Sequence, residues 1–106
     1  MDTFLAIASR RDERRYRPEP LAPGAVERIL DAGRLSGSAR NRQPWQFVIP
    51  ENEERRAMLA GAVFVPENVV TASLVVCVVV ADGSSVAFDA GRATQSMLLA
   101  AWNEGV

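Results

Sequence analysis

The feature that most constrains this chain is an unbroken apolar run of eight residues, Leu74 to Ala81, with the letters LVVCVVVA. Its length and β-branched composition are typical of a central strand that is covered on both faces. The run is too short to span a bilayer as a helix. A fully buried strand needs neighbours on both of its edges, so the chain has to build a sheet around it.

The remaining segments predict one more strand and four helices. PWQFVI (residues 44–49) predicts a short strand with Trp45, Phe47 and Ile49 on one side. Capping residues and helical spacing predict helices over residues 2–11, 23–35, 53–62 and 88–103, and FVPENV (64–69) is read as a loop. Helices that alternate with strands indicate a single α/β or α+β domain over residues 1–106.

Two strands are few for an open sheet, which usually has about four to six. The sequence also stops at NEGV, directly after the last predicted helix. We therefore expect that another segment or another subunit completes the core.

Composition excludes several kinds of chemistry. The net charge is −1, and the twelve basic residues are all arginine, with no histidine. Without histidine, no Ser-His-Asp triad or histidine-based metal site is possible, and an acidic chain is a poor nucleic-acid binder. The single cysteine, Cys77, permits neither an internal disulfide nor a thiolate metal cluster. We expect a cytoplasmic protein with no metal, no nucleic-acid partner and no membrane segment.

Five of the twelve arginines lie in one stretch, RRDERRYR, over residues 10–17. One interpretation is a solvated surface cluster in which arginine pairs with Asp12 and Glu13. The other is a phosphate cradle, because the planar guanidinium presents a fork of donors that suits phosphate oxygens. Arg10 and Arg14 can converge whether the stretch is helical or extended. The stretch alone leaves both interpretations open.

A second polar stretch, SGSARNRQPWQFVI, starts at Ser36. Its small residues would let the backbone approach a ligand closely, and Gly37 would permit a tight turn. The alternative is an ordinary helix end that leads into a strand. Arg40 and Arg42 add two cations, so one composite anion site made from both stretches becomes more plausible.

Together these stretches resemble the nitroreductase family of flavin enzymes. The resemblance rests on RRDERRYRPEPL, ILDAGRLSGSARNRQPWQFVI, TASLVVCVVV and DAGRATQSMLLAAWNEGV, in that order along nearly the whole chain. It implies a nitroreductase-like sheet flanked by helices, apparently incomplete in this chain. Residues 89–102 would form a long helix at the core of a dimer.

The resemblance also implies FMN, bound at a homodimer interface by both subunits. The residues implied as cofactor contacts are Arg10, Arg11 and Arg14 for the phosphate and ribityl chain, and Gly37, Ser38 and Asn41 in the loop from the other subunit. NAD(P)H would be the electron donor, and a nitroaromatic, quinone or similar small molecule the acceptor. No catalytic side chain is implied, because the flavin performs the chemistry.

Three departures from the family pattern matter. Asp12 stands where serine is frequent, so we expect its carboxylate to orient Arg11, Arg14 or Arg15. Gly37-Ser38 stands where Pro-Ser is frequent. Family domains also continue past NEGV, which predicts a domain truncated at its C-terminus. The alternatives are a flavin-binding or structural remnant without turnover and, less consistent with the acidic composition, a nucleic-acid-binding module.

Overall fold

Two helices, α2 (Pro23–Arg34) and α5 (Val86–Asn103), form the centre of the fold in a computed structural model that describes residues 1–83 and 85–106. Pro23 opens α2, where its missing N–H leaves no hydrogen bond unmade. Ile29 and Gly33 are buried on α2, and Ala93 and Met97 are buried on α5. Each pair is spaced by one helical turn, so the two helices pack along these buried faces.

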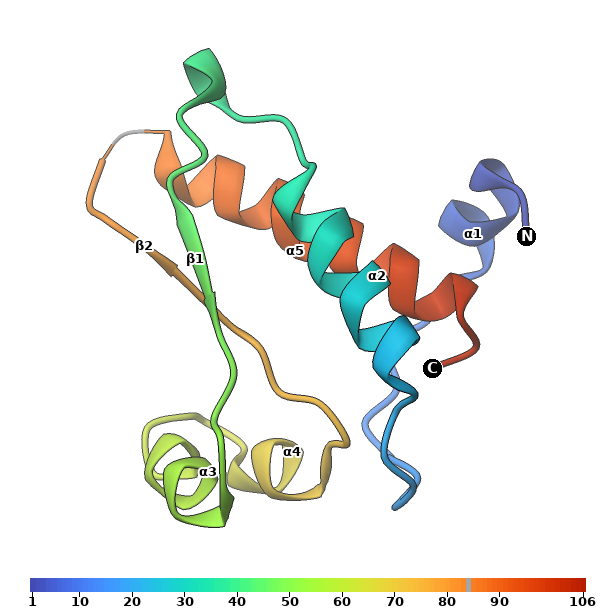
Figure 1. Cartoon of the computed structure of the whole chain (residues 1–106), viewed down its shortest axis with the longest axis vertical. Helices are drawn as coiled ribbons and strands as arrows, with labels where there is room; N and C mark the ends of the chain where they lie inside the picture. Colours follow the sequence, from blue (N-terminus) through green and yellow to red (C-terminus); the bar gives the residue numbers. More distant parts are fainter. Residues whose placement is uncertain (84) are drawn as a thin grey trace.

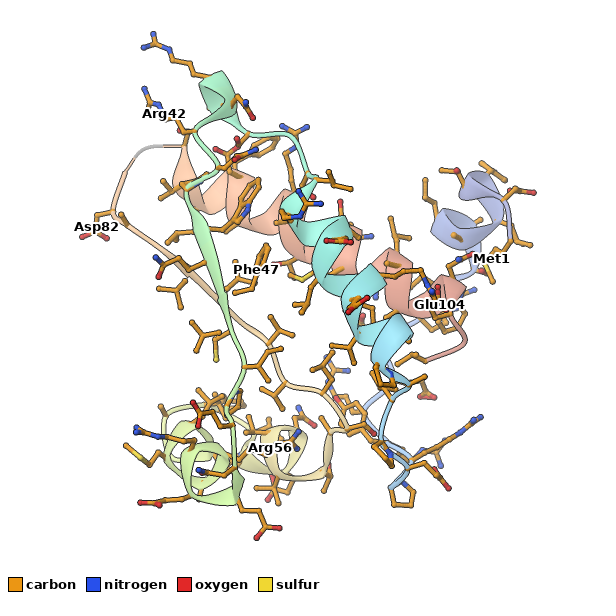
Figure 2. All side chains as sticks on the ribbon, in the orientation of Figure 1. Met1, Arg42, Phe47, Arg56, Asp82 and Glu104 are labelled. Atoms are coloured by element: carbon orange, nitrogen blue, oxygen red, sulfur yellow. The ribbon has the colours of Figure 1, made fainter. Side chains whose placement is uncertain are left out.

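A small residue lets the two helices come close to the first strand. A Cβ atom on Gly33 would lie 2.8 Å from Cζ of Phe47 and 2.9 Å from Sδ of Met97. Figure 2 shows Phe47 projecting from its strand toward α2 and α5. Gly33 therefore marks the point where α2, α5 and the strand meet.

The sheet consists of β1 (Trp45–Val48) and β2 (Cys77–Val80), which pair antiparallel with Trp45 opposite Val80 and Val48 opposite Cys77. On β1 the side chains of Trp45 and Phe47 are half-buried, whereas Gln46 and Val48 are exposed. The predicted alternation is therefore confirmed for Trp45 and Phe47, whereas Ile49, predicted on the same side, lies beyond the end of β1 and is 37% exposed. The two half-buried rings stack with their centroids 6.2 Å apart.

The second strand corrects the prediction made for Leu74 to Ala81. Only Cys77–Val80 joins the ladder, because β1 offers four residues as partners. Among the described residues β2 pairs with β1 alone, and Val79 is 46% exposed. The strand is thus not covered on both faces here. The described part of the chain therefore leaves apolar side chains of this strand partly exposed.

The outer helices follow local capping signals. Asp2 caps α1 (Thr3–Ser9) and Asn52 caps α3 (Glu53–Ala60), each through its side-chain oxygen. Both helices end two residues earlier than predicted, and α5 begins two residues earlier. The loop predicted over residues 64–69 is wrong, because Pro66 begins a further helix, α4 (Pro66–Thr71), at its first turn.

The elements are arranged around α5 (Figure 1). The first helix, α1, lies beside the C-terminal end of α5, and the 3₁₀ turn η1 (Ala39–Asn41) lies near its N-terminal end. At the far end of the strands α3 packs on α4, where the Arg56 guanidinium donates to the carbonyl oxygens of Val69, Ala72 and Ser73. Helices with a small antiparallel sheet confirm the predicted mixed α+β class.

Candidate functional site

The arginine-rich stretch over residues 10–17 follows α1 as irregular chain, which is exposed except at the half-buried Arg10. Its five arginines against Asp12 and Glu13 give a net charge of +3. The chain is anchored at both ends of the stretch. Trp102 Nε1 donates to Oγ of Ser9 at 2.8 Å, and Oγ of Ser73 donates to the carbonyl of Arg17 at 2.9 Å. The fold therefore holds the arginine-rich stretch beside the C-terminal end of α5.

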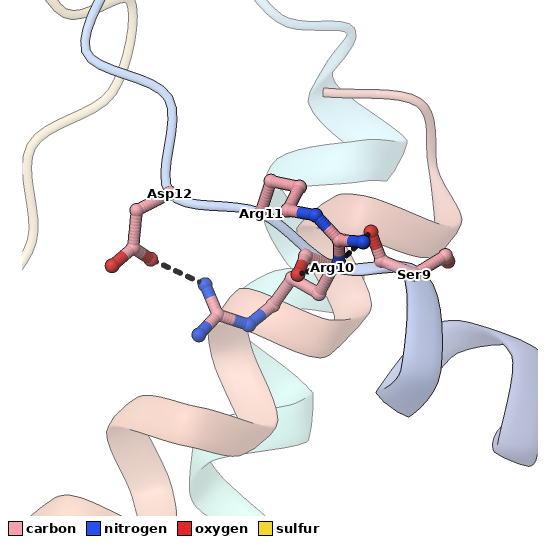
Figure 3. Close-up of polar contacts among 4 residues, drawn as sticks. All are labelled: Ser9, Arg10, Arg11 and Asp12. Carbon is pink, nitrogen blue, oxygen red and sulfur yellow. Dashed lines mark hydrogen bonds and ion pairs between the residues drawn. The ribbon is translucent and has the colours of Figure 1, made fainter.

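Asp12 pairs with Arg10 in this stretch. Figure 3 shows Nη1 of Arg10 donating to Oδ1 of Asp12, a contact of 2.7 Å. This hydrogen bond and the charge of Arg10 hold the pKa of the Asp12 carboxyl below its ordinary value, and the charge of Arg14 adds to the effect. The expectation that Asp12 orients Arg11, Arg14 or Arg15 is therefore wrong in its partner, because the carboxylate of Asp12 takes the guanidinium two residues earlier.

Arg11 folds back onto the end of α1 (Figure 3). Its Nη1 donates to the carbonyl oxygens of Ala8, Ser9 and Arg10 at 3.3, 3.0 and 3.0 Å. The last carbonyls of a helix have no partner within the helix, so a guanidinium placed there satisfies them. Among the described residues Arg14 makes no ion pair, and its side chain is exposed. Arg10 and Arg11 thus each engage one guanidinium nitrogen, Nη1, and keep the others available for a ligand.

The polar loop after α2 adopts an unusual backbone. Arg40, Asn41 and Gln43 have φ angles of 53°, 53° and 51°, a region that residues with a side chain rarely adopt. Inside the loop, Oγ of Ser38 accepts the N–H of Gln43 at 2.9 Å, and Oδ1 of Asn41 accepts from Nε2 of Gln43 at 3.3 Å. Ser38 and Asn41 are therefore brought together, through Gln43.

Gly37 has a different role from the turn that the sequence suggested. The left-handed backbone falls on the three residues above and not on Gly37. A Cβ atom on Gly37 would lie 2.5 Å from Nη2 of Arg92, so the missing side chain leaves room for that guanidinium. Arg92 also lies over the ring of Phe88, 5.8 Å from its centroid.

The loop is tied to the body of the fold by a buried carboxylate. Asp89, in the first turn of α5, is 2% exposed, and its two oxygens lie 3.3 and 3.2 Å from the backbone nitrogen of Ala39. Neither Asp89 nor Arg92 was predicted as part of the site. The available signal was the acidic residue at the head of DAGRATQ, but its loop partner lies fifty residues away in sequence.

The predicted site residues form two groups that do not meet within one chain. Ser9, next to Arg10, contacts Trp102, while Ala39, next to Ser38, contacts Asp89. At 1.5 Å of rise per residue, the two anchor points on α5 are about 20 Å apart. Figure 1 shows the two groups at opposite ends of this helix. The composite site expected from both stretches is not assembled by this chain alone.

Over residues 1–83 and 85–106, no group of three or more histidine, cysteine, aspartate or glutamate residues lies close enough together to hold a metal ion. None of the helices in that part is long and apolar enough to cross a membrane.

Comparison with known proteins identifies the fold. The model of the nitroreductase family matches residues 7–76, a span that includes both the arginine-rich stretch and the polar loop. The chain belongs to the nitroreductase family. The predicted family and the nitroreductase-like fold are thereby confirmed.

Individual relatives agree with this assignment. An NADH dehydrogenase of Thermus thermophilus is 37% identical over 75 residues, which cover 71% of this chain and 37% of that protein. A Desulfovibrio desulfuricans protein, described as a nitroreductase in complex with FMN, superposes with a TM-score of 0.87 at 31% identity, covering 95% of this chain and 62% of that one. Nitroreductase A of Vibrio parahaemolyticus superposes with a TM-score of 0.90 at 25% identity, covering 99% and 53%. The chain therefore spans only part of the length of these proteins.

Proposed function

We propose that this chain is part of an FMN-dependent oxidoreductase, which passes electrons from NAD(P)H to a nitroaromatic, a quinone or a similar small acceptor. The observation that carries the proposal is the match over 95% of the chain to a protein described in complex with FMN. The arginine-rich stretch adds a chemical reason, because it offers a dense set of guanidinium donors to a phosphate. Residues 1–106 would act as one nitroreductase-like domain in the cytoplasm.

The residues present fit the phosphate end of FMN. A guanidinium carries five N–H donors, and Asp12 engages only one nitrogen of Arg10. Arg10 and Arg14 would hold the phosphate, and Arg11 would support them by fixing the end of α1. The stretch keeps a net charge of +3 after its two carboxylates are counted, which favours a dianionic ligand.

The separation of the two groups along α5 supports a site shared between two copies of the chain. Arg10, Arg11 and Arg14 of one subunit would face Gly37, Ser38 and Asn41 of the other in a homodimer. Closed twofold dimers are the commonest soluble oligomers, and their symmetry would create two such sites. The exposed face of α5, which includes Phe88 at 71% and Leu98 at 43% exposure, offers apolar surface for the dimer core.

Bound FMN would supply the redox chemistry, so no side chain of this protein has to act as an acid or base. The chain's residues would bind and orient. The arginines fix the phosphate, and the strained loop presents Ser38 and Asn41 at a set position. Polar groups held rigidly before binding contribute more than mobile ones, because they need no reorganisation.

Purified protein would test the proposal by FMN titration followed by NADH and NADPH oxidation. We expect bound, yellow FMN and oxidation of one or both nucleotides in the presence of a nitroaromatic or quinone. The double variant Arg10→Ala/Arg14→Ala should lose FMN and remain folded, whereas the matched control Arg15→Ala/Arg17→Ala should keep it. Protein that stays colourless at saturating FMN would refute the proposal. An intact FMN affinity in the first double variant would refute the assignment of Arg10 and Arg14 to the phosphate.

A second candidate is a flavin-binding remnant without turnover. The observation that favours it is coverage, since the chain matches 37% of the Thermus thermophilus relative. This candidate predicts FMN binding with no oxidation of either nucleotide above the rate of free FMN. The same titration and assay therefore separate the two functions.

A further inference from the structure

Asp89 is buried in a way that its position in a helix does not require. An acidic residue in the first turn of a helix is favoured by the helix dipole, and it gains that benefit while exposed. Glu53 and Glu54 occupy the first turn of α3 in this manner, on the surface. Asp89 is instead 2% exposed, and burial of a carboxylate is costly unless donors compensate it. The compensation must come from the groups that face it.

The donor that faces Asp89 belongs to the polar loop. Both carboxylate oxygens lie within 3.3 Å of the backbone nitrogen of Ala39. Ala39 is the first residue of η1, preceded by Ser38 and followed by the left-handed residues Arg40 and Asn41. The buried charge is thus attached at the point where the strained part of the loop begins.

Strained backbone persists only where its surroundings hold it. The contacts among Ser38, Asn41 and Gln43 lie inside the loop, so they would move with it as a unit. The link from Ala39 to Asp89 fixes that unit to α5. Arg92, one turn further along α5, adds a packing contact at Gly37.

We propose that Asp89 is a positioning residue of the flavin site. By accepting the Ala39 N–H, its carboxylate holds Gly37, Ser38 and Asn41 in the conformation that meets FMN bound by the other subunit. The choice of ligand rests on the proposed function. The anchoring of the loop does not, because it follows from the contacts within one chain.

The test compares Asp89→Ala, Asp89→Asn and wild type, with Glu53→Ala as the control for loss of an acidic residue in a first turn. Amide hydrogen exchange of the FMN-free protein reads the loop, and FMN titration reads the site. Asp89→Ala should raise exchange at Ala39 about tenfold or more, as expected for one lost buried hydrogen bond to a charged group, with a similar loss of FMN affinity. Asp89→Asn keeps an acceptor oxygen and should restore most of both. Glu53→Ala should change neither.

The outcomes separate this inference from the proposed function. If wild type binds no FMN, the proposed function fails, and exchange at Ala39 still decides whether Asp89 holds the loop. Unchanged exchange at Ala39 in Asp89→Ala would overturn the inference, and so would raised exchange with an unchanged FMN affinity. The inference would also be overturned if Asp89→Asn changed exchange at Ala39 and FMN affinity as much as Asp89→Ala does. Should Asp89→Ala fail to fold, Ala39→Pro removes the donor from the other side and should weaken FMN binding to the same degree.

Discussion

The indole N–H of Trp102 donates to Oγ of Ser9 at 2.8 Å, joining the end of α5 to the last residue before the arginine-rich stretch. Ser9 in turn donates to the carbonyl of Leu5, so it links α1 to α5. Trp102→Phe keeps an aromatic ring and removes the donor. We expect a loss of about 1 kcal/mol of stability, with faster amide exchange in α1, measured by urea unfolding and hydrogen exchange. Unchanged exchange in α1 would show that apolar packing alone holds this helix.

A side chain added at Gly33, where α2, α5 and β1 meet, should destabilise the fold. In Gly33→Ala the new methyl would lie 2.9 Å from Met97 and closer still to Phe47, so packed side chains must move. We expect destabilisation by about 1–3 kcal/mol in thermal or urea unfolding. Gly91→Ala is the matched control, since its Cβ would meet nothing within 4 Å. That change should stabilise the free chain by up to about 1 kcal/mol. Equal effects of the two changes would contradict the packing described here.

The fold could be predicted from the sequence where local signals decide it. Pro23 and the four-residue spacing of Ile29 and Gly33 specify α2 locally, so its bounds could be predicted. The helix that starts at Pro66 could not be predicted, because proline both ends helices and starts them, and the choice depends on the residues it packs beside. The strand around Cys77 was predicted too long because its length depends on a partner strand of four residues.

The candidate site, like the fold, could be predicted only in part from the sequence. The stretches that contain Arg10 and Asn41 carry residue types that point to a ligand. Their separation along α5 follows from tertiary packing, which no local pattern specifies. The link between Ala39 and Asp89 was likewise out of reach, since it joins residues fifty positions apart.

Asp12 competes with a bound phosphate for Arg10, so replacing it should tighten FMN binding. Asp12→Ser removes the carboxylate that Arg10 contacts at 2.7 Å and restores the residue frequent in the family. We expect a several-fold lower dissociation constant for FMN at low salt and a smaller gain at high salt, because exposed charges are screened. Glu13→Ser serves as the control for loss of one negative charge. Weaker binding in Asp12→Ser would mean that Asp12 instead orients Arg10 productively.

The pair between Arg28 of α2 and Glu104 after α5 predicts a pH dependence. Nη2 of Arg28 donates to Oε2 of Glu104 at 2.7 Å, which lowers the pKa of Glu104 below its ordinary 4.5. A carboxyl with a lowered folded-state pKa stabilises the fold above pH 4.5, and this contribution is lost as the pH falls through the lower value. Arg28→Ala should therefore raise the pKa of Glu104, measured by NMR titration, and flatten the acid limb of the stability curve. An unchanged pKa would contradict the pairing in solution.

The proposed flavin site is made from the arginine-rich stretch of one subunit and the polar loop of another. The most direct test uses two variants that should each lose FMN, Arg10→Ala/Arg14→Ala and Ser38→Ala/Asn41→Ala. They are mixed, unfolded together and refolded, so that mixed dimers form. In a mixed dimer both defects fall on one site and leave the other intact, so random pairing should recover about a quarter of the wild-type FMN capacity. A mixture that binds no more FMN than either variant alone, while wild type binds it, would contradict the shared site.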